Sequence, residues 1–178
     1  MSAGFQSEAF EDKEKTTNRC SIVSIYEDRG DRDLLFGLCD SLAWTFKDDL
    51  EFTTDWWRFK YLADPEIGFE AAQSATDADL ILLAARSPEL PTEVKRWFET
   101  WLPNRTSPNG ALVFVPSAPR ATPVATYLRH TARRARLDYV PLLSTWVEDA
   151  AARLSAAQDE VNELISYHDR PQHWGINE

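Results

Sequence analysis

The chain has 178 residues, which is typical of one domain, and its 29 acidic and 19 basic residues give a formal net charge of −10. This charge excludes a general nucleic-acid-binding surface and an anionic-membrane surface, because both need a basic field. Two cysteines without metal-ligand spacing, no apolar run of about 18 residues and no signal-like N-terminus lead us to expect a cytoplasmic protein without a membrane span.

The first third of the chain predicts an arm, a strand, a helix and a second strand. Residues 1–19 are polar and charged, and we expect a flexible arm. SIVSIY, at 21–26, is short and β-branched and predicts a buried strand. Leucines at helical spacing predict a helix over 32–48, with Asp31 as its N-cap. Residues 51–62 mix β-branched and aromatic side chains, which is typical of an edge strand.

The middle of the chain predicts a central strand between two helices. The Asp64-Pro65 pair marks a break before a short helix at 66–76. Residues 78–85, ADLILLAA, are apolar on both faces, as in a central parallel strand. The next helix is the most clearly amphipathic in the chain, with apolar residues at i, i+3, i+4, i+7 and i+8. These residues are Val94, Trp97, Phe98, Trp101 and Leu102.

The last third predicts two more strands and two more helices. ALVFV, at 111–115, is a second buried strand, and Thr122-Pro123 opens a helix that extends to about Arg136. Pro141 weakens the strand expected at 137–143 or places it at an edge. A final helix to about Tyr167 is predicted by an apolar face made of Val147, Ala150, Leu154, Val161, Leu164 and Ile165.

Strict alternation of strands and helices predicts an α/β fold with three layers. We expect a five-stranded, mostly parallel sheet in the flavodoxin/receiver-like order 2-1-3-4-5. The chain then divides into the arm at 1–19, one α/β domain at 20–168 and a C-terminal tail at 169–178.

The tail ends in an unusual sequence, HWGINE. Pro171 ends the preceding helix, and Gly175 permits a tight bend. A docked indole buries considerable apolar area, whereas an exposed one gains nothing. We therefore expect Trp174 and Ile176 to fold back over the acidic strand ends as a clasp; the alternative is a disordered tail.

Ligands of such sheets bind at the carboxyl ends of the strands, near the point where strands one and three diverge. The polar residues expected there form a candidate ligand ring of Glu27, Asp28, Arg86, Ser87 and Ser117.

The acidic residues of this ring have two interpretations. Glu27 and Asp28 could bind a divalent cation such as Mg²⁺ through oxygen ligands. The favoured interpretation is that they cap the following helix and complement its dipole. The acidic EDRGDRD segment repels phosphate, and G-x-G-x-x-G is absent from the sequence, so FMN and NAD are not expected. We predict no cofactor, and no metal site other than this candidate one for Mg²⁺.

DADLILLAARSPELP resembles the third strand and following loop of response-regulator receivers. A receiver carries its phosphoryl-acceptor Asp where this chain has Ala84 or Ala85, and a Lys where it has Pro141 to Ser144. Aspartyl-phosphate chemistry cannot proceed without the nucleophile and its cation. The resemblance therefore implies a receiver-like shape. Because the acceptor and its cation are missing, we do not expect an enzyme.

One helix is basic within this acidic protein. Its arginines either pair with acids of the final helix, such as Glu148 and Glu160, or form a docking face for an acidic partner or a second copy of the chain. This candidate docking face consists of Arg129, Arg133, Arg134 and Arg136, with Arg120 just before them.

Two motifs carry a family resemblance. ELPTEVKRWFETWLP at 89–103 and the terminal WGINE resemble segments of small uncharacterised bacterial proteins of similar length, and the resemblance implies the fold without any catalytic residues. We therefore expect a non-catalytic, receiver-like interaction or regulatory module. The alternative is a small-ligand or metal-assisted enzyme that uses the strand-end ring.

Overall fold

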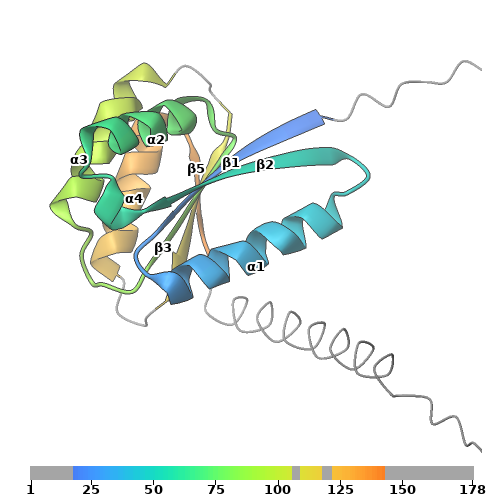
Figure 1. Ribbon diagram of the computed structural model, residues 1–178, viewed down its shortest axis with the longest axis horizontal. Coiled ribbons are helices and arrows are strands. Elements are labelled where there is room, and N and C mark those ends of the chain that lie inside the picture. Colours follow the sequence, from blue (N-terminus) through green and yellow to red (C-terminus); the bar gives the residue numbers. More distant parts are fainter. Residues whose placement is uncertain (1–17, 106–108, 118–121, 143–178) are drawn as a thin grey trace, which may run out of the picture.

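A computed structural model describes residues 18–105, 109–117 and 122–142 of the chain. Within these ranges, five strands alternate with four α-helices (Figure 1). The strands are β1 (Asn18–Tyr26), β2 (Leu50–Arg58), β3 (Leu80–Ala85), β4 (Ala111–Pro116) and β5 (Asp138–Pro141). The helices are α1 (Arg29–Thr45), α2 (Pro65–Asp77), α3 (Thr92–Trp101) and α4 (Thr122–Ala135), with short 3-10 turns at Phe59–Tyr61 and Leu102–Asn104.

The sheet has the order β2-β1-β3-β4-β5, and every neighbouring pair is parallel, which confirms the predicted flavodoxin-like topology. Its register aligns the carboxyl ends of the central strands: Tyr26 of β1 pairs with Ala84 of β3, and Ala84 pairs with Val115 of β4. The segments that follow these strands therefore meet at one edge of the sheet.

The helices lie on both faces of the sheet, with α2, α3 and α4 on one face and α1 on the other (Figure 1). Alternate residues of β1 divide between these faces. Val23 and Ile25 belong to the larger core cluster with α2, α3 and α4, whereas Ile22 packs in the smaller cluster with Leu35 and Leu38 of α1. Burial on both faces explains the continuous apolar run of β3.

The structure corrects several predicted boundaries. β1 begins at Asn18, three residues earlier than expected and inside the segment predicted as an arm. The prediction that Asp31 is the N-cap of the first helix is wrong. The N-cap is Asp28, whose side chain accepts a hydrogen bond from the Asp31 amide, and α1 starts at Arg29. β2 lies at the edge of the sheet as predicted, but it ends at Arg58.

Some sequence predictions lie outside the described residues. These are the arm before Asn18, Arg120, the final helix with its acids, and the clasp of Trp174 and Ile176. Among the helices that the structure describes, none is both long enough and apolar enough to span a membrane.

Candidate functional site

The carboxyl ends of the central strands bring together the residues of the predicted ring. Glu27 and Asp28 follow β1, Arg86 and Ser87 follow β3, and Ser117 follows β4. Most of these residues contact one another directly, together with one residue that was not predicted, Asp31. We call the set of Glu27, Asp28, Asp31, Arg86, Ser87 and Ser117 the strand-end network.

Glu27 joins the end of β1 to the loop after β3. Its Oε2 accepts hydrogen bonds from the backbone amides of Arg86 and Ser87, both at 2.9 Å, and its Oε1 accepts one from the Ser87 hydroxyl. The expectation that Glu27 caps the first helix is therefore wrong, because its carboxylate points across to the neighbouring strand. Burial alone would raise the pKa of Glu27, but these hydrogen bonds outweigh it and lower the pKa below its usual value.

Asp28 performs the capping role that was expected of the acidic pair. Its Oδ1 accepts the Asp31 amide at 3.0 Å, and the Asp31 carboxylate accepts the Asp28 amide at 3.3 Å, which completes a capping box. Asp28 Oδ2 also lies 3.6 Å from Arg86 Nη1. This ion pair is partly exposed, so its contribution to stability is small, but it links α1 to the loop after β3.

Asp31 is the member of the network that sequence reasoning missed as a site residue. It is 0% exposed, and its Oδ1 has no hydrogen-bond partner among the described residues. Burial raises the pKa of Asp31, and the nearby Ser117 hydroxyl opposes that change without forming a hydrogen bond of standard geometry. The signal in the sequence was the D-x-x-D spacing of Asp28 and Asp31, which matches a capping box.

The network extends to the edge of the sheet. Arg58 at the end of β2 donates a hydrogen bond from Nε to the Glu27 carbonyl at 3.2 Å. Contacts therefore run from β2 through β1 to β3, and the Asp31–Ser117 pair continues them to β4. Both acids considered for Mg²⁺, Glu27 and Asp28, have protein partners. Within the described ranges, no cluster of three or more His, Cys, Asp or Glu residues is placed to hold a metal ion.

We predict that Asp31→Asn changes the free energy of unfolding by no more than about 1 kcal/mol near pH 7. Asparagine keeps an oxygen for the Asp28 amide and removes a buried charge. Because the folded pKa of Asp31 is raised, its contribution to stability is present below the unfolded pKa and is lost as pH rises through the folded pKa. The variant should therefore gain stability relative to wild type as the pH rises, measured by urea unfolding from about pH 4 to 7.

Asp33→Asn is the matched control, because it removes an exposed acid from the same helix. It should show little of this pH dependence. If Asp31→Asn instead lost more than about 2 kcal/mol near pH 7, the carboxylate charge itself would be needed by the fold.

The arginines of the predicted docking face have different surroundings in the structure. Arg134 forms a two-pronged pair with Glu99 of α3, with both hydrogen bonds at 2.6 Å. The guanidinium carbon of Arg129 lies 5.6 Å from the ring centre of Tyr139. Arg136 follows α4 in a left-handed conformation with φ 57°, and Arg133 is exposed. Arg134 thus joins α4 to α3, and Arg133 and Arg136 are the better candidates for an outer partner.

We predict a small coupling free energy between Arg134 and Glu99, although the geometry of the pair is good. The two side chains are 42% and 50% exposed, and exposed pairs contribute about 0.2–1 kcal/mol. A double-mutant cycle of Arg134→Ala and Glu99→Ala, measured by urea unfolding, should give a coupling free energy in this range. A value of zero would show that the pair adds nothing to the packing of α4 on α3.

Taken together, the fold and the strand-end network describe an α/β protein of flavodoxin-like topology whose central strand ends are joined by Glu27. No protein-family model matches this chain, and no curated protein matches it. The function is therefore argued from the geometry of the site.

Proposed function

We propose that this chain is a non-catalytic, receiver-like interaction or regulatory module of the cytoplasm. The proposal rests on the hydrogen bonds of Glu27. Its carboxylate, at the end of β1, accepts hydrogen bonds from Arg86 and Ser87 at the end of β3. This is the position where ligands of such sheets bind. A carboxylate held in this way by protein donors does not offer the open oxygen ligands that a catalytic Mg²⁺ needs.

The end of β3 supports the same proposal. Ala84 and Ala85 stand where a receiver has its phosphoryl acceptor, and both are buried. Neither side chain has an atom that can attack phosphorus. The family resemblance of the 89–103 and WGINE motifs, which points to small bacterial proteins, is part of this proposal.

For the partner, we propose an acidic protein surface, which includes that of a second copy of this chain. Arg133 and Arg136 give the end of α4 a basic character in a chain of net charge −10. Electrostatic complementarity of this kind favours association with acidic proteins and gives it a strong dependence on salt. Nucleic acid and membranes are not part of the proposal.

The chemical part of the proposal is tested with a small phosphodonor. Incubation with acetyl phosphate and Mg²⁺ should leave the intact mass of the chain unchanged, and calorimetric titration with Mg²⁺ should give no binding heat. A phosphoryl adduct on the folded chain would overturn the non-catalytic assignment.

The interaction part is tested by sedimentation velocity at low salt and increasing protein concentration. We expect self-association that weakens with added salt and with Arg133→Glu. Lys47→Glu is the matched control, because it makes the same charge change at an exposed position near the end of α1, on the other face of the sheet. A strictly monomeric chain that also retains no protein in a pull-down would contradict this part.

One observation favours the alternative of a small-ligand or metal-assisted enzyme. Asp31 and Ser117 place a buried carboxyl of raised pKa beside a buried hydroxyl at the strand ends, and perturbed groups of this kind gather at functional sites. This alternative requires binding of Mg²⁺, Mn²⁺ or a nucleotide that Asp28→Asn weakens. Calorimetric titration of both forms distinguishes it from the first proposal.

A further inference from the structure

The two edges of the sheet differ in how they are protected from further pairing. β5, at one edge, has four residues and ends in Pro141. β2, at the other edge, has nine residues and no proline, and it pairs with β1 without interruption from Leu50 to Arg58. An edge strand presents a row of unpaired backbone N–H and C=O groups, and proteins often protect it by shortness, a bulge or proline. β5 is short and contains proline, whereas β2 has none of these three protections.

Aromatic surface lies beside the open edge of β2. On the face of the sheet covered by α1, Phe52 and Trp56 are half-buried in the smaller core cluster. Phe36 of α1 lies against Trp56, with ring centres 6.1 Å apart, and it is still 57% exposed. On the opposite face, alternate residues from Glu51 to Asp55 are exposed. A strand added at this edge would therefore cover apolar surface on one face and meet polar side chains on the other.

Charge is divided along β2 in a way that selects the direction of an added strand. Asp48 and Asp49 are exposed and precede the first residue of β2. Arg58 is its last residue, and the exposed Lys60 follows it. An antiparallel copy of the same strand places the acidic start of one β2 against the basic end of the other, and it does so twice. A parallel copy would oppose like charges at both ends, so charge complementarity favours the antiparallel arrangement.

One antiparallel register pairs the whole of β2 with itself. Side chains that lie opposite each other across two strands share a face of the sheet, so the two-fold axis must pass through a residue. An axis through Thr54 places Phe52 opposite Trp56 of the second copy on the α1 face. On the other face it places Thr53 opposite Asp55 of the second copy, where a hydroxyl donor meets a carboxylate. Cross-strand aromatic pairs of this kind stabilise a sheet.

The neighbouring registers are disfavoured by charge. An axis through Thr53 places Glu51 opposite Asp55 of the second copy, and it does so twice. An axis through Asp55 places the two Asp55 carboxylates opposite each other. Like charges directly opposite each other are destabilising. The register about Thr54 avoids both conflicts and also forms the longest pairing.

We infer that the edge of β2 binds the β2 edge of a second copy of this chain, antiparallel and in register about Thr54. The two five-stranded sheets then form one continuous sheet, which is held by backbone hydrogen bonds and by the Phe52–Trp56 pairs. This goes beyond the proposed function, because it uses a surface separate from Arg133 and Arg136. Those arginines belong to the region of α4, which packs beside β5 at the far edge of the sheet.

The dimer is tested first in the wild-type chain at high salt. In about 0.5 M NaCl, which screens exposed charges, sedimentation velocity should show a dimer fraction that rises between about 1 and 300 µM protein. Hydrogen–deuterium exchange at the two ends of this range should show added protection in peptides that cover β2. Peptides that cover β5 should show none. The association expected through Arg133 weakens with salt, so this measurement separates the two surfaces.

Charge changes at Thr53 test the register. They are made in an Arg133→Glu background at about 0.15 M NaCl, which leaves the β2 edge as the surface under test. Thr53→Glu faces Asp55 of the second copy twice and should weaken the dimer about three- to tenfold. Thr53→Lys faces the same carboxylates and should tighten it about two- to fivefold. Because Thr53 is exposed, both variants should keep the fold, which is checked by thermal unfolding.

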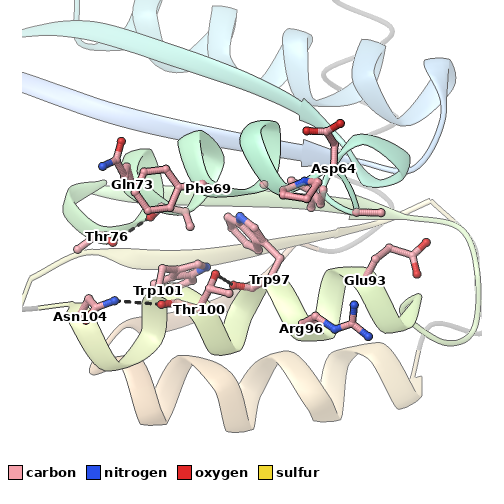
Figure 2. A pocket seen from close by; sticks show the side chains of 15 residues that line it. Asp64, Phe69, Gln73, Thr76, Glu93, Arg96, Trp97, Thr100, Trp101 and Asn104 are labelled. Carbon is pink, nitrogen blue, oxygen red and sulfur yellow. Dashed lines mark hydrogen bonds between the residues drawn. The ribbon is translucent and has the colours of Figure 1, made fainter.

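Gln73→Glu and Gln73→Lys are the matched controls. Gln73 is an exposed residue of α2 that lines a pocket shared with α3, so it faces away from the edge of β2 (Figure 2). These variants make the same charge changes and should leave the dimer affinity unchanged. A response equal to that of the Thr53 variants would show that only the net charge of the chain matters.

Four outcomes would overturn the inference. The first is a chain that stays monomeric over the whole concentration range at high salt. The second is a dimer that weakens equally with Thr53→Glu and Thr53→Lys, which would place the axis through Thr53 itself. The third is a dimer whose added protection lies outside β2. The fourth is full protection of β2 at concentrations where the chain is monomeric, which would assign the edge to another segment of the same chain. Each of these leaves the phosphodonor and Arg133→Glu results for the proposed function intact.

Discussion

Replacement of Glu27 by alanine is expected to lower the free energy of unfolding by about 1–3 kcal/mol near pH 7. The substitution removes the acceptor of three hydrogen bonds, from the Arg86 amide and from the amide and hydroxyl of Ser87. These groups hold the loop after β3 against the end of β1. Glu27 and Ser87 are partly exposed, so water replaces some of the lost bonds and keeps the loss within this range.

The effect of Glu27→Ala should depend on pH in a defined direction. The folded pKa of Glu27 is lowered from the usual value of 4.5. Its stabilising contribution is therefore present above the unfolded pKa and is lost as the pH falls through the folded pKa. The difference between wild type and variant should narrow in acid, below about pH 4.5, and be largest near neutrality.

Chemical rescue gives a second measurement on the same variant. With the carboxylate gone, two backbone amides and a hydroxyl face one position, an arrangement that binds anions. Acetate or formate should therefore raise the melting temperature of Glu27→Ala more than that of wild type, at equal ionic strength.

The control for this rescue is Glu89→Ala, which removes an exposed acid from the same loop. It should lose little stability and show no response to acetate. Glu27→Ala could instead have the same free energy of unfolding as wild type, and acetate could leave its melting temperature unchanged. Glu27 would then not hold the strand ends together, and the proposed function would lose the observation that supports it.

Arg105→Ala is expected to cost more, about 2–4 kcal/mol. Its guanidinium donates to the carbonyls of Ala75 and Thr76 near the end of α2, at 3.1 and 3.2 Å, and to those of Ala78 and Asn109, at 2.9 and 2.8 Å. The last carbonyls of a helix have no partner within the helix. One side chain thus satisfies the end of α2 and joins it to the segment before β4.

The surroundings of Arg105 leave little room for a substitute. Burial lowers the pKa of its guanidinium, although the nearby Asp79 and Asp77 oppose that change. Gly110 packs so closely that a Cβ there would lie 2.7 Å from Arg105 Nη2, and its φ of 132° favours glycine. Arg105→Lys should recover part of the loss at most, because one ammonium cannot reach four carbonyls in the same geometry.

The loss of unfolding free energy expected for Arg105→Ala is measured by urea unfolding. Arg19→Ala is the control, because Arg19 is an exposed arginine that forms an ion pair with Glu51. It should change the free energy of unfolding by less than about 0.5 kcal/mol. A loss below about 1 kcal/mol for Arg105→Ala would show that water satisfies these carbonyls equally well.

The sequence alone determined the topology of this protein. The apolar run of β3, the edge character of β2 and the heptad-like spacing of the α3 tryptophans each follow from burial on one or both faces of an element. The alternation of strands and helices then leaves few arrangements, and the observed strand order is the predicted one. The sequence also located the polar residues of the strand ends, because the chain order places them after the strands.

The tertiary structure decided what those residues do. Glu27 reaches the loop after β3 only because parallel pairing of β1 and β3 aligns their ends, and the two segments are about 60 positions apart in sequence. The same register sends Asp28 rather than Glu27 to the helix and buries Asp31 beside Ser117. These contacts join segments distant in the chain, and local propensity and periodicity do not specify their distances.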